Sequence, residues 1–226
     1  MDVSKIMDQG EDFLLGGEDA IKNLSEKDSA SIVVVSDSHG DAKDLLTVIK
    51  DSENCDCLIF CGDGISDLSM ILGTVLLSGS QIQIPPVLAF VRGNNDFQTF
   101  ALKNPQTGTL TNINVPPEVV IPVAGHKIFA THGHLQGVYA GLKNLREAAK
   151  NHGADVALFG HTHVASYSTA CGMLSLNPGS SRLPRENQPK TFAKIFLERG
   201  RTPSDCSFFA IDGEKILPFK YPVLID

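Results

Sequence analysis

The sequence lacks the two features that mark exported and membrane-spanning chains. Its first residues hold no basic segment followed by an apolar run, so no secretory signal is expected. One uncharged stretch, residues 68–91, is long enough to cross a membrane, but residues 78–81, Gln83 and the Pro85-Pro86 pair interrupt it. We interpret the stretch as a helix, a loop and a strand, and we expect no membrane association.

Cysteine is scarce, and its number is odd. Five cysteines in a chain of 226 residues are typical of a reducing compartment rather than of a disulfide framework, which predicts a cytoplasmic protein. Cys55, Cys57 and Cys61 lie close together in the sequence, but a metal site would need a fourth ligand and a recognised spacing. We interpret these three residues as small core side chains.

Basic residues are outnumbered by acids. Lysine and arginine total 19 against 26 aspartates and glutamates, which gives a net charge of −7. Because nucleic acids and anionic membranes attract clusters of Lys and Arg, broad binding to either is not expected. Residues 1–30 hold eight of the acids and only three lysines, so most of the net negative charge lies there.

Length and pattern predict one main domain. A chain of 226 residues allows one large domain or two small ones, and no repeat or low-complexity linker divides residues 31–226. We predict an acidic N-terminal extension over residues 1–30 and a single domain over residues 31–226. Within the extension, Phe13-Leu14-Leu15, Ile21 and Leu24 fit either a short docked helix or a loose arm.

Short β-branched or apolar runs indicate the fold class. Five of them end at a polar or glycine-rich turn, at residues 31–35, 58–60, 87–91, 127–130 and 156–159. Helical patterns follow the first two runs. A third helical pattern covers residues 137–151, where Tyr139, Leu142, Leu145 and Ala149 share one side. This alternation predicts a parallel sheet with crossover helices. The last third has strand-like runs with few helix signals, so we predict a two-sheet α/β domain that ends in antiparallel strands.

Each of the five runs is followed by a residue that can bind a metal. Ligands of open α/β sheets bind beyond the carboxyl ends of the strands, so these side chains are expected to meet. Asp37-x-His39 and His161-x-His163 have the i, i+2 spacing that points both side chains the same way on chain leaving a strand. Seven donors suit two divalent ions, and Asp63, flanked by glycines, is the predicted shared carboxylate. The donors are Asp37, His39, Asp63, Asn94, His132, His161 and His163.

Each donor taken alone has a simpler interpretation. A single Asp or His after a strand is more often a helix cap or a turn residue than a ligand. Five independent strand ends of this kind favour a metal site, because caps do not require histidine. His126 and His152 lie outside the set, and we interpret them as ordinary surface residues.

The motifs resemble those of a known family. Over about residues 31–219, their order, spacing and strand context are similar to the five blocks of the calcineurin-like metallophosphoesterases. The turn Asn177-Pro178-Gly179-Ser180 is similar to one in the small bacterial and archaeal phosphodiesterase branch. The five blocks are Asp37-Ser38-His39, Gly62-Asp63, Gly93-Asn94-Asn95-Asp96, Thr131-His132-Gly133-His134 and Gly160-His161-Thr162-His163.

The resemblance implies a fold and a set of metal ligands. The fold would be a four-layer αββα sandwich, with two mixed β-sheets face to face and helices outside. One ion would be bound by Asp37, His39 and His163, the other by Asn94, His132 and His161, and both by Asp63. Manganese, iron, nickel and zinc all occur in the family, and the mixed oxygen and nitrogen ligands do not choose among them. Manganese is the metal that we predict first.

The charge of such a centre favours diester substrates. Two divalent ions held by two carboxylates keep a surplus of two positive charges, which lowers the pKa of a bridging water and supplies hydroxide for in-line attack. A diester anion plus hydroxide balances this surplus, whereas a monoester dianion exceeds it. We therefore predict a metal-dependent phosphodiesterase that acts on a small phosphoester.

Two alternatives stay open. A phosphomonoesterase or a nucleotide pyrophosphatase would use the same core, because a shared core does not fix the substrate. A non-catalytic scaffold of this fold, as in the retromer subunit, would have eroded metal blocks, whereas all seven ligand positions here hold competent side chains. The sequence also leaves open whether the protein is a monomer or a homo-oligomer.

One position departs from the family pattern. The third block is usually Gly-Asn-His followed by Asp or Glu, and that histidine is thought to stabilise the transition state or protonate the leaving oxygen. This chain has Asn95 there, and an amide has no titratable proton to give. His134, two residues beyond His132, is the predicted substitute acid, with a surface histidine beside a ligand as the alternative. Asp96 is expected to bind backbone amides rather than metal.

Other residues are candidates for holding the substrate. Arg182 and Arg185 follow the turn at residues 177–180 and could contact a phosphate through paired N–H donors. The alternative is that both are solvated loop arginines. Asn94 is also predicted to contact the substrate.

Overall fold

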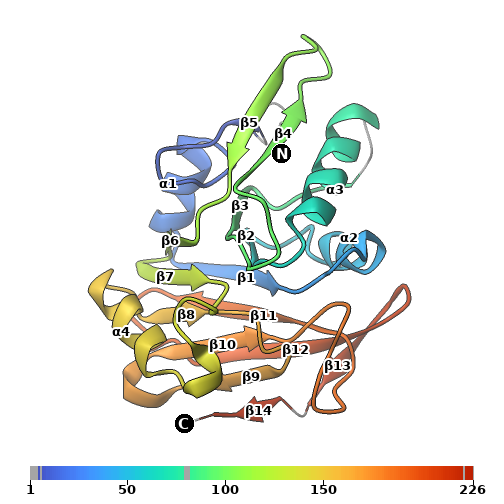
Figure 1. Cartoon of the computed structure of the whole chain (residues 1–226). Helices are drawn as coiled ribbons and strands as arrows, with labels where there is room; N and C mark the ends of the chain where they lie inside the picture. Colours follow the sequence, from blue (N-terminus) through green and yellow to red (C-terminus); the bar gives the residue numbers. More distant parts are fainter. Residues whose placement is uncertain (1–4, 6, 79–81, 221, 226) are drawn as a thin grey trace.

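Two six-stranded sheets form the centre of the computed structural model, which describes residues 5, 7–78, 82–220 and 222–225 (Figure 1). The first sheet has the order β13-β12-β11-β1-β2-β3. Its strands are β1 (Ser29–Val35), β2 (Cys57–Phe60), β3 (Val87–Phe90), β11 (Thr191–Glu198), β12 (Asp205–Asp212) and β13 (Lys215–Phe219).

The first sheet joins a parallel half to an antiparallel half. β1, β2 and β3 run parallel, whereas β11, β12 and β13 pair antiparallel to their neighbours. Helices α2 (Ala42–Asp51) and α3 (Ile65–Ser78) connect the parallel strands, as the alternating pattern predicts. The parallel strands therefore end at the same edge of the sheet.

The second sheet has the order β14-β9-β10-β8-β7-β6. β7, β8 and β10 run parallel, and β6 and β9 pair antiparallel with β7 and β10. α4 (Lys143–Asn151) follows β7 along the chain. The strands are β6 (Glu118–Val123), β7 (His126–Thr131), β8 (Val156–Leu158), β9 (Ala165–Ser168), β10 (Leu174–Pro178) and β14 (Val223–Leu224).

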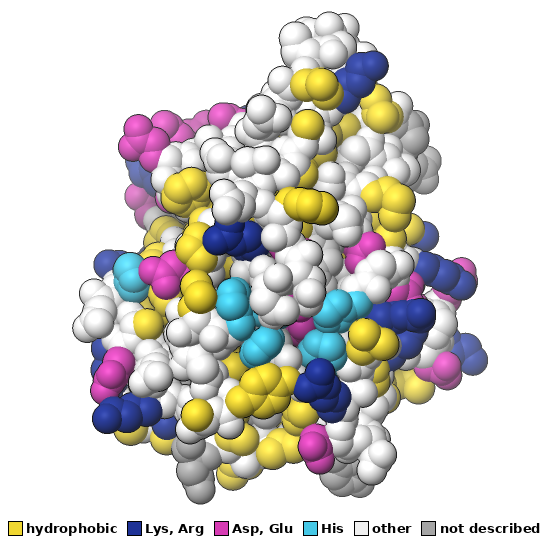
Figure 2. All heavy atoms as spheres, viewed as in Figure 1, with side chains coloured by type: hydrophobic (Ala, Val, Ile, Leu, Met, Phe, Trp, Pro, Cys, Tyr) yellow, Lys and Arg dark blue, Asp and Glu magenta, His cyan; other side chains and the backbone are white. Residues whose placement is uncertain are grey.

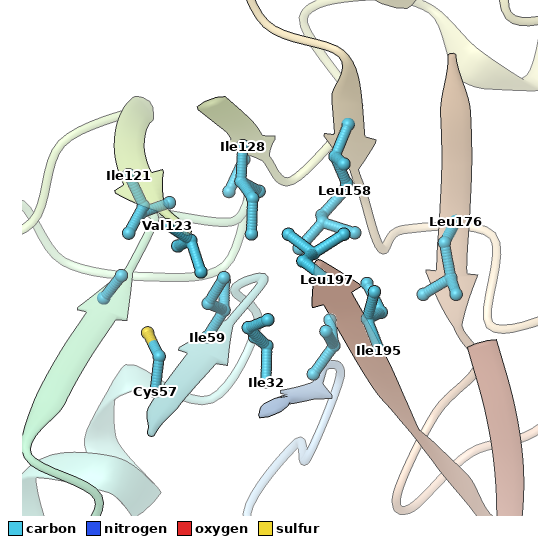
Figure 3. Close-up of a cluster of buried hydrophobic side chains, with 14 of the residues drawn as sticks. Ile32, Cys57, Ile59, Ile121, Val123, Ile128, Leu158, Leu176, Ile195 and Leu197 are labelled. Atoms are coloured by element: carbon cyan, nitrogen blue, oxygen red, sulfur yellow. The ribbon is translucent and has the colours of Figure 1, made fainter. Parts of the chain in front are cut away.

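The main hydrophobic core lies between the two sheets. Figure 3 shows Ile121, Ile128 and Leu158 of the second sheet facing Ile32 and Ile59 of the first. A second buried cluster packs α2 and α3 on the outer face of the first sheet, and a third packs α4 on the outer face of the second. This order of layers confirms the four-layer αββα sandwich.

The N-terminal segment contains a docked helix rather than a loose arm. α1 (Glu18–Glu26) packs against β3 and β6, which are the edge strands of the two sheets. Leu14, Leu15 and Leu24 are buried. Leu15 also exchanges two backbone hydrogen bonds with Leu88 of β3, at 2.9 and 3.0 Å. Residues 14–26 thus close one side of the sandwich.

Several elements differ from the expectations. The hairpin of β4 (Thr99–Lys103) and β5 (Leu110–Asn114) was not anticipated, because its runs mix polar and apolar residues, and β6 was not anticipated either. The predicted helix over residues 137–151 is a short 3₁₀ turn, η2 (Val138–Ala140), followed by α4, and a second short turn is η3 (Ala170–Gly172). Gly141, with a φ of 112°, separates η2 from α4, so Tyr139 is exposed rather than aligned with Leu145.

The interpretation of His126 as a surface residue is wrong. Only 8% of His126 is exposed. Its Nδ1 lies 2.7 Å from Asp155 Oδ2, and its Nε2 lies 2.9 Å from the carbonyl oxygen of Glu198. His126 begins β7 and Glu198 ends β11, so the imidazole connects the two sheets. His152 is exposed, as expected.

The structure also tests the expectations about the three clustered cysteines and about membrane-spanning helices. Cys55, Cys57 and Cys61 are free and buried, which confirms their interpretation as core side chains. Burial raises the pKa of the Cys57 and Cys61 thiols. No helix in the described part of the chain is long and apolar enough to cross a membrane.

Candidate metal centre

The chemically active side chains follow strands of both sheets. Asp37 and His39 follow β1, Asp63 follows β2, His132 follows β7, and His161 follows β8. Figure 2 shows histidine side chains gathered near the centre of one face, with arginine, lysine and hydrophobic side chains around them. The predicted meeting of these strand ends therefore occurs, at the end of the sandwich where parallel strands from both sheets terminate.

Asp37, His39 and His163 form the first group of potential ligands. One ligand atom from each residue lies within 4.8 Å of the others. His163 Nε2 lies 3.2 Å from Asp37 Oδ1, and His39 Nε2 lies 3.1 Å from His163 Nε2 and 3.7 Å from Asp37 Oδ1. Two imidazole nitrogens and a carboxylate oxygen that converge in this way suit a divalent cation.

Asp37, Asp63 and His132 form the second group. His132 Nε2 lies 3.5 Å from Asp63 Oδ2 and 4.0 Å from Asp37 Oδ1. Asp37 Oδ1 and His132 Nε2 are both buried without a hydrogen-bond partner among the described residues. Unpaired buried polar atoms are costly. A cation in contact with both atoms would remove this cost, so the residues present fit a metal.

Hydrogen bonds on the outer side fix the tautomers of two histidines. His132 Nδ1 donates to the carbonyl oxygen of Cys61 at 2.7 Å, and His163 Nδ1 donates to that of Leu183 at 2.7 Å. Because Nδ1 then carries the proton, the Nε2 lone pair of each ring points into the site. This is the orientation that a metal ligand requires.

Asp63 belongs to the second group and also faces His39 of the first, whereas Asp37 belongs to both groups. Asp63 Oδ2 is 3.7 Å from His39 Nε2 and 3.5 Å from His132 Nε2. One carboxylate oxygen thus faces histidines that the resemblance assigns to different ions. Asp37 Oδ1 faces the same two histidines at 3.7 and 4.0 Å, so the bridging role of Asp63 stays a prediction. Asn95 holds the Asp63 carboxylate, because its backbone N–H donates to Oδ1 at 2.8 Å and its side-chain amide donates to Oδ2 at 2.7 Å.

Asp96 fixes the surrounding loops. Its Oδ2 accepts the backbone N–H groups of Asp63 at 2.6 Å and Gly93 at 2.9 Å. Its Oδ1 accepts those of Gly64 and Ile65, both at 2.9 Å, at the start of α3. The expectation that Asp96 binds backbone amides is confirmed.

His161, His134 and Asn94 lie around the second group. The imidazole of His161 is 5.1 Å from that of His132 between ring centroids, and its backbone N–H donates to Asp37 Oδ2 at 3.2 Å. The His134 ring is 5.4 Å from His132 and 6.0 Å from His161, and its Nδ1 is buried without a partner within the described structure. Asn94 is exposed on the β3 loop. The roles of all three stay predictions.

The two carboxylates and the imidazoles stabilise each other's charge. Burial would raise the pKa of Asp37, but the imidazoles of His163 and His39 beside it hold this pKa below its usual value. Burial acts likewise on Asp63, and contact with His132 lowers its pKa well below the usual range. Burial lowers the pKa of His132, but contact with Asp63 raises it above its usual value. Both carboxylates are therefore anionic at neutral pH.

The pKa values of His161 and His134, which lie around the second group, shift in the opposite direction from that of His132. Burial lowers the pKa of His161 and of His134, and the charge of His132 lowers both pKa values further. The nearby Asp37 carboxylate raises the pKa of His39. The pKa of His39 thus moves upward, as that of His132 does, whereas the pKa values of His161 and His134 move downward.

The ligand loops adopt an unusual backbone conformation. Asp37, His39, Asp63, His161 and His163 have φ values of 56°, 41°, 56°, 69° and 61°. Such left-handed conformations are rare outside glycine, cost of order 1–3 kcal/mol each and cluster at functional sites. Gly93 and Gly160 permit close approach, because a Cβ atom would lie 2.1 Å from Asp63 Oδ1 and from Ser36 Oγ, respectively.

Some residues that shape the site were not predicted. The Asn177 side chain donates to the carbonyl oxygen of Gly160 at 2.7 Å and so holds the β8 loop. Ser180 Oγ donates to the carbonyl oxygen of Asp37 at 2.7 Å. Both lie in the turn at residues 177–180, whose resemblance to the family was the available signal. Tyr139, whose ring is 5.1 Å from that of His161, gave no signal in the sequence.

The two candidate arginines have different partners. Arg182 Nη1 lies 3.1 Å from Asp41 Oδ2, so its guanidinium is engaged in an ion pair at the protein surface. Arg185 Nη1 donates to the Tyr139 hydroxyl at 2.5 Å. That hydroxyl in turn donates to the carbonyl oxygen of His161 at 3.1 Å.

Known proteins are similar to this chain in sequence and in fold. The family model of the calcineurin-like phosphoesterase superfamily domain matches residues 31–200. The chain is 33% identical over 169 residues to the probable metallophosphoesterase YsnB of Bacillus subtilis, covering 74% of this chain and 85% of that one. It is 30% identical over 154 residues to Phosphodiesterase MJ0936 of Methanocaldococcus jannaschii, covering 66% and 82%, respectively.

Solved structures of other proteins are also similar to this chain. A predicted phosphoesterase from Streptococcus pneumoniae matches with a TM-score of 0.62 and 25% identity, over 84% of this chain and 93% of that one. Vacuolar Protein Sorting 29 of Cryptosporidium parvum matches with a TM-score of 0.62 and 18% identity, over 85% and 97%, which is a likeness of the fold alone. The chain belongs to the calcineurin-like phosphoesterase superfamily, a family of metal-dependent phosphoester hydrolases.

Proposed function

We propose that the protein is a dinuclear metal-dependent phosphodiesterase. One observation carries the proposal: Asp37 Oδ1 and His132 Nε2 are buried and unpaired within the described structure, where they converge with His39, His163 and Asp63. Thirty per cent identity to Phosphodiesterase MJ0936 adds support for diesters.

The proposed ligands divide between two ions. Asp37 and Asp63 neutralise part of the metal charge, and the histidines contribute neutral nitrogen donors. When bound, two divalent ions lower the pKa of a water molecule to supply a nucleophile near neutral pH and neutralise charge on the phosphoryl oxygens. Manganese is proposed first, with iron, nickel and zinc as alternatives. Asp37, His39 and His163 would hold one ion, Asn94, His132 and His161 the other, and Asp63 both.

Asn95 would hold the bridging carboxylate, and His134 would act on the leaving group. Asn95 orients Asp63 through two hydrogen bonds, at 2.8 and 2.7 Å, and it has no proton to transfer. His134 lies beside His132 with a ring nitrogen that has no partner among the described residues. We therefore assign leaving-group protonation to His134.

Substrate charge distinguishes the proposed activity from its main alternative. A centre with two uncompensated positive charges is balanced by a diester anion and a hydroxide, which favours diesters over monoester dianions. Asn94 is proposed to contact the substrate. Arg182 could do so only by exchanging its ion pair with Asp41 for the phosphate.

The proposal is tested by metal removal and return. The protein is stripped with a chelator and reloaded with manganese, and turnover of bis(4-nitrophenyl) phosphate is compared with that of 4-nitrophenyl phosphate. We expect activity to require metal and to favour the diester. D63N should abolish turnover, whereas D212N, which changes an exposed aspartate of β12, should retain it.

Other outcomes have definite meanings. A preference for the monoester would favour a phosphomonoesterase. Turnover that is unchanged by stripping would contradict the metal-dependent mechanism. Failure to bind any of the four metals would favour the scaffold alternative.

Location and assembly complete the proposal. Five free cysteines fit a reducing compartment, and we propose a cytoplasmic protein on that basis. A homo-oligomer stays a prediction that light scattering would test.

A further inference from the structure

Tyr139 and Arg185 form a fixed pair at the rim of the candidate metal centre. The Tyr139 hydroxyl accepts a hydrogen bond from Arg185 Nη1 at 2.5 Å and donates one to the carbonyl oxygen of His161 at 3.1 Å. The tyrosine ring also meets the His161 imidazole edge-on, at 5.1 Å between centroids. The guanidinium is therefore held beside the backbone of a proposed ligand, outside the ring of ligand atoms.

Both residues lie on loops that are hydrogen-bonded to the loops of the metal centre. Tyr139 lies on η2, whose Val138 N–H donates to the carbonyl oxygen of Gly133, next to His132, at 3.3 Å. The Arg185 N–H donates to the carbonyl oxygen of His163 at 3.1 Å. The pair thus joins the loop after β7, which carries Tyr139, to the loop after β10, which carries Arg185, and both residues bond to the loop after β8. Its position is tied to that of the proposed ligands.

Arg185 differs from its basic neighbours in its partners. Arg182 and Lys190 both form ion pairs with Asp41, at 3.1 and 3.4 Å. Within the part of the chain that the structure describes, no ion pair joins Arg185 to a carboxylate. Arg185 and Tyr139 are both exposed, and 61% of Tyr139 is accessible to solvent. Ordering two exposed side chains has an entropic cost, and an accessible, positioned guanidinium is suited to bidentate oxyanion recognition.

We propose that Arg185, held by Tyr139, is a subsite for an oxyanion that the substrate carries outside its scissile diester. This inference deepens the proposed function and rests on it. With two divalent ions bound, the two carboxylates, a diester and a hydroxide would balance the charge of the centre, so the charge of Arg185 would be left for a second anionic group. The substrate class is a phosphodiester whose retained arm ends in a phosphate or a carboxylate.

A matched series of substrates tests the subsite. Three diesters share the 4-nitrophenyl leaving group and a short alkyl arm that ends in a methyl, a carboxylate or a phosphate group. The readout is kcat/KM for 4-nitrophenolate release, expressed as the ratio of each anionic substrate to the methyl substrate. For the preferred anion, we expect R185Q to lower this ratio about ten- to hundredfold, as loss of a hydrogen bond to a charged group does.

Variants separate binding from loop structure. R185K keeps the charge without the planar fork and should lower the ratio less than R185Q. Y139F removes the hydroxyl that positions the guanidinium and should give a smaller drop of the same sign. R201Q, an exposed arginine paired with Glu198, should leave the ratio unchanged. A purely structural Arg185, or one that contacts the scissile phosphoryl group, would lower all three substrates equally, and that constant ratio would overturn the proposal.

A binding measurement keeps the two proposals separable. Calorimetry compares propane-1,3-bisphosphonate with propylphosphonate on the metal-loaded protein. The subsite predicts tighter binding of the bisphosphonate, and R185Q should remove that preference. If no diester is turned over but the preference depends on Arg185, the phosphodiesterase proposal fails and the subsite stands. An equal preference in wild type and R185Q would overturn the subsite.

Discussion

The buried His126 predicts a part of the protein's stability that depends on pH. Its Nδ1 faces Asp155 Oδ2 at 2.7 Å and its Nε2 faces the carbonyl oxygen of Glu198 at 2.9 Å. Both partners are acceptors, so the imidazole satisfies both only when each nitrogen carries a proton. Burial lowers the pKa of His126, but the hydrogen bonds with Asp155 and Glu198 raise it above its usual value, against a smaller opposing effect of Arg199.

The stability that His126 contributes can be estimated from its two hydrogen bonds and from the exposure of Asp155. A hydrogen bond to a charged group contributes about 1.5–3 kcal/mol. Because 39% of the Asp155 side chain is exposed, solvent screening places its bond toward the low end of that range. H126Q removes the charge and keeps at most one of the two contacts, so we expect the free energy of unfolding to fall by about 2 kcal/mol at pH 5.5. That is a decrease in Tm of about 4–8 °C for a chain of this length.

The pH dependence has a definite sign. A folded-state pKa raised above the unfolded value of about 6.5 contributes stability that is fully present below pH 6.5 and lost as pH rises through the folded pKa. Urea denaturation of wild type and H126Q from pH 5.5 to 9 should give a difference that shrinks with rising pH. D155N should reduce this dependence, and the double variant should show that the two effects are coupled. A difference that stays constant or grows with pH would refute the assignment of a charged His126.

Three further predictions concern the metal centre and its supports. D63N should lose or weaken both metals by elemental analysis, because one substitution removes the charge shared between them, and near-normal occupancy of two metals would refute the bridging role. N95H should raise turnover of alkyl diesters more than of aryl diesters and H134A should lower it selectively, whereas an equal effect on both classes would exclude a role in leaving-group protonation. D96A removes the acceptor of four backbone N–H groups and should lower the urea-derived free energy of unfolding by about 3 kcal/mol; an unchanged midpoint would show that the loops hold without Asp96.

The strand ends were predictable because their signal is local. Each run of β-branched or apolar residues stops at a polar turn, and sheet geometry alone brings the carboxyl ends of parallel strands together. Asp63 is predicted to be the shared carboxylate because it stands between glycines and central in order. The layer order depended on the resemblance, since alternation of strands and helices does not specify how two sheets pack.

Other features depend on contacts that sequence spacing does not encode. His126 lies between Gly125 and Lys127, which do not indicate burial, and only the arrival of Glu198 from the other sheet makes it a buried connection. Tyr139 fits a helical period with Leu145, but Gly141 at a φ of 112° breaks the helix and turns the phenol toward His161. Leu14 and Leu24 have the same local pattern in a docked helix as in a loose arm, so only tertiary packing decides between them.

The docked N-terminal segment has a consequence for self-association. The family model begins at residue 31, yet Leu15 pairs with the outer edge of β3, and α1 covers the side where β3 and β6 lie. A protein trimmed to the family boundary would present unpaired N–H and C=O groups along β3 beside the cavities left by Leu14 and Leu24. A bare strand edge next to apolar surface is a template for a second chain. Leu15 and α1, which precede the part matched by the family model, thus cover an edge that could otherwise pair with a second chain. This role is separate from any part in catalysis.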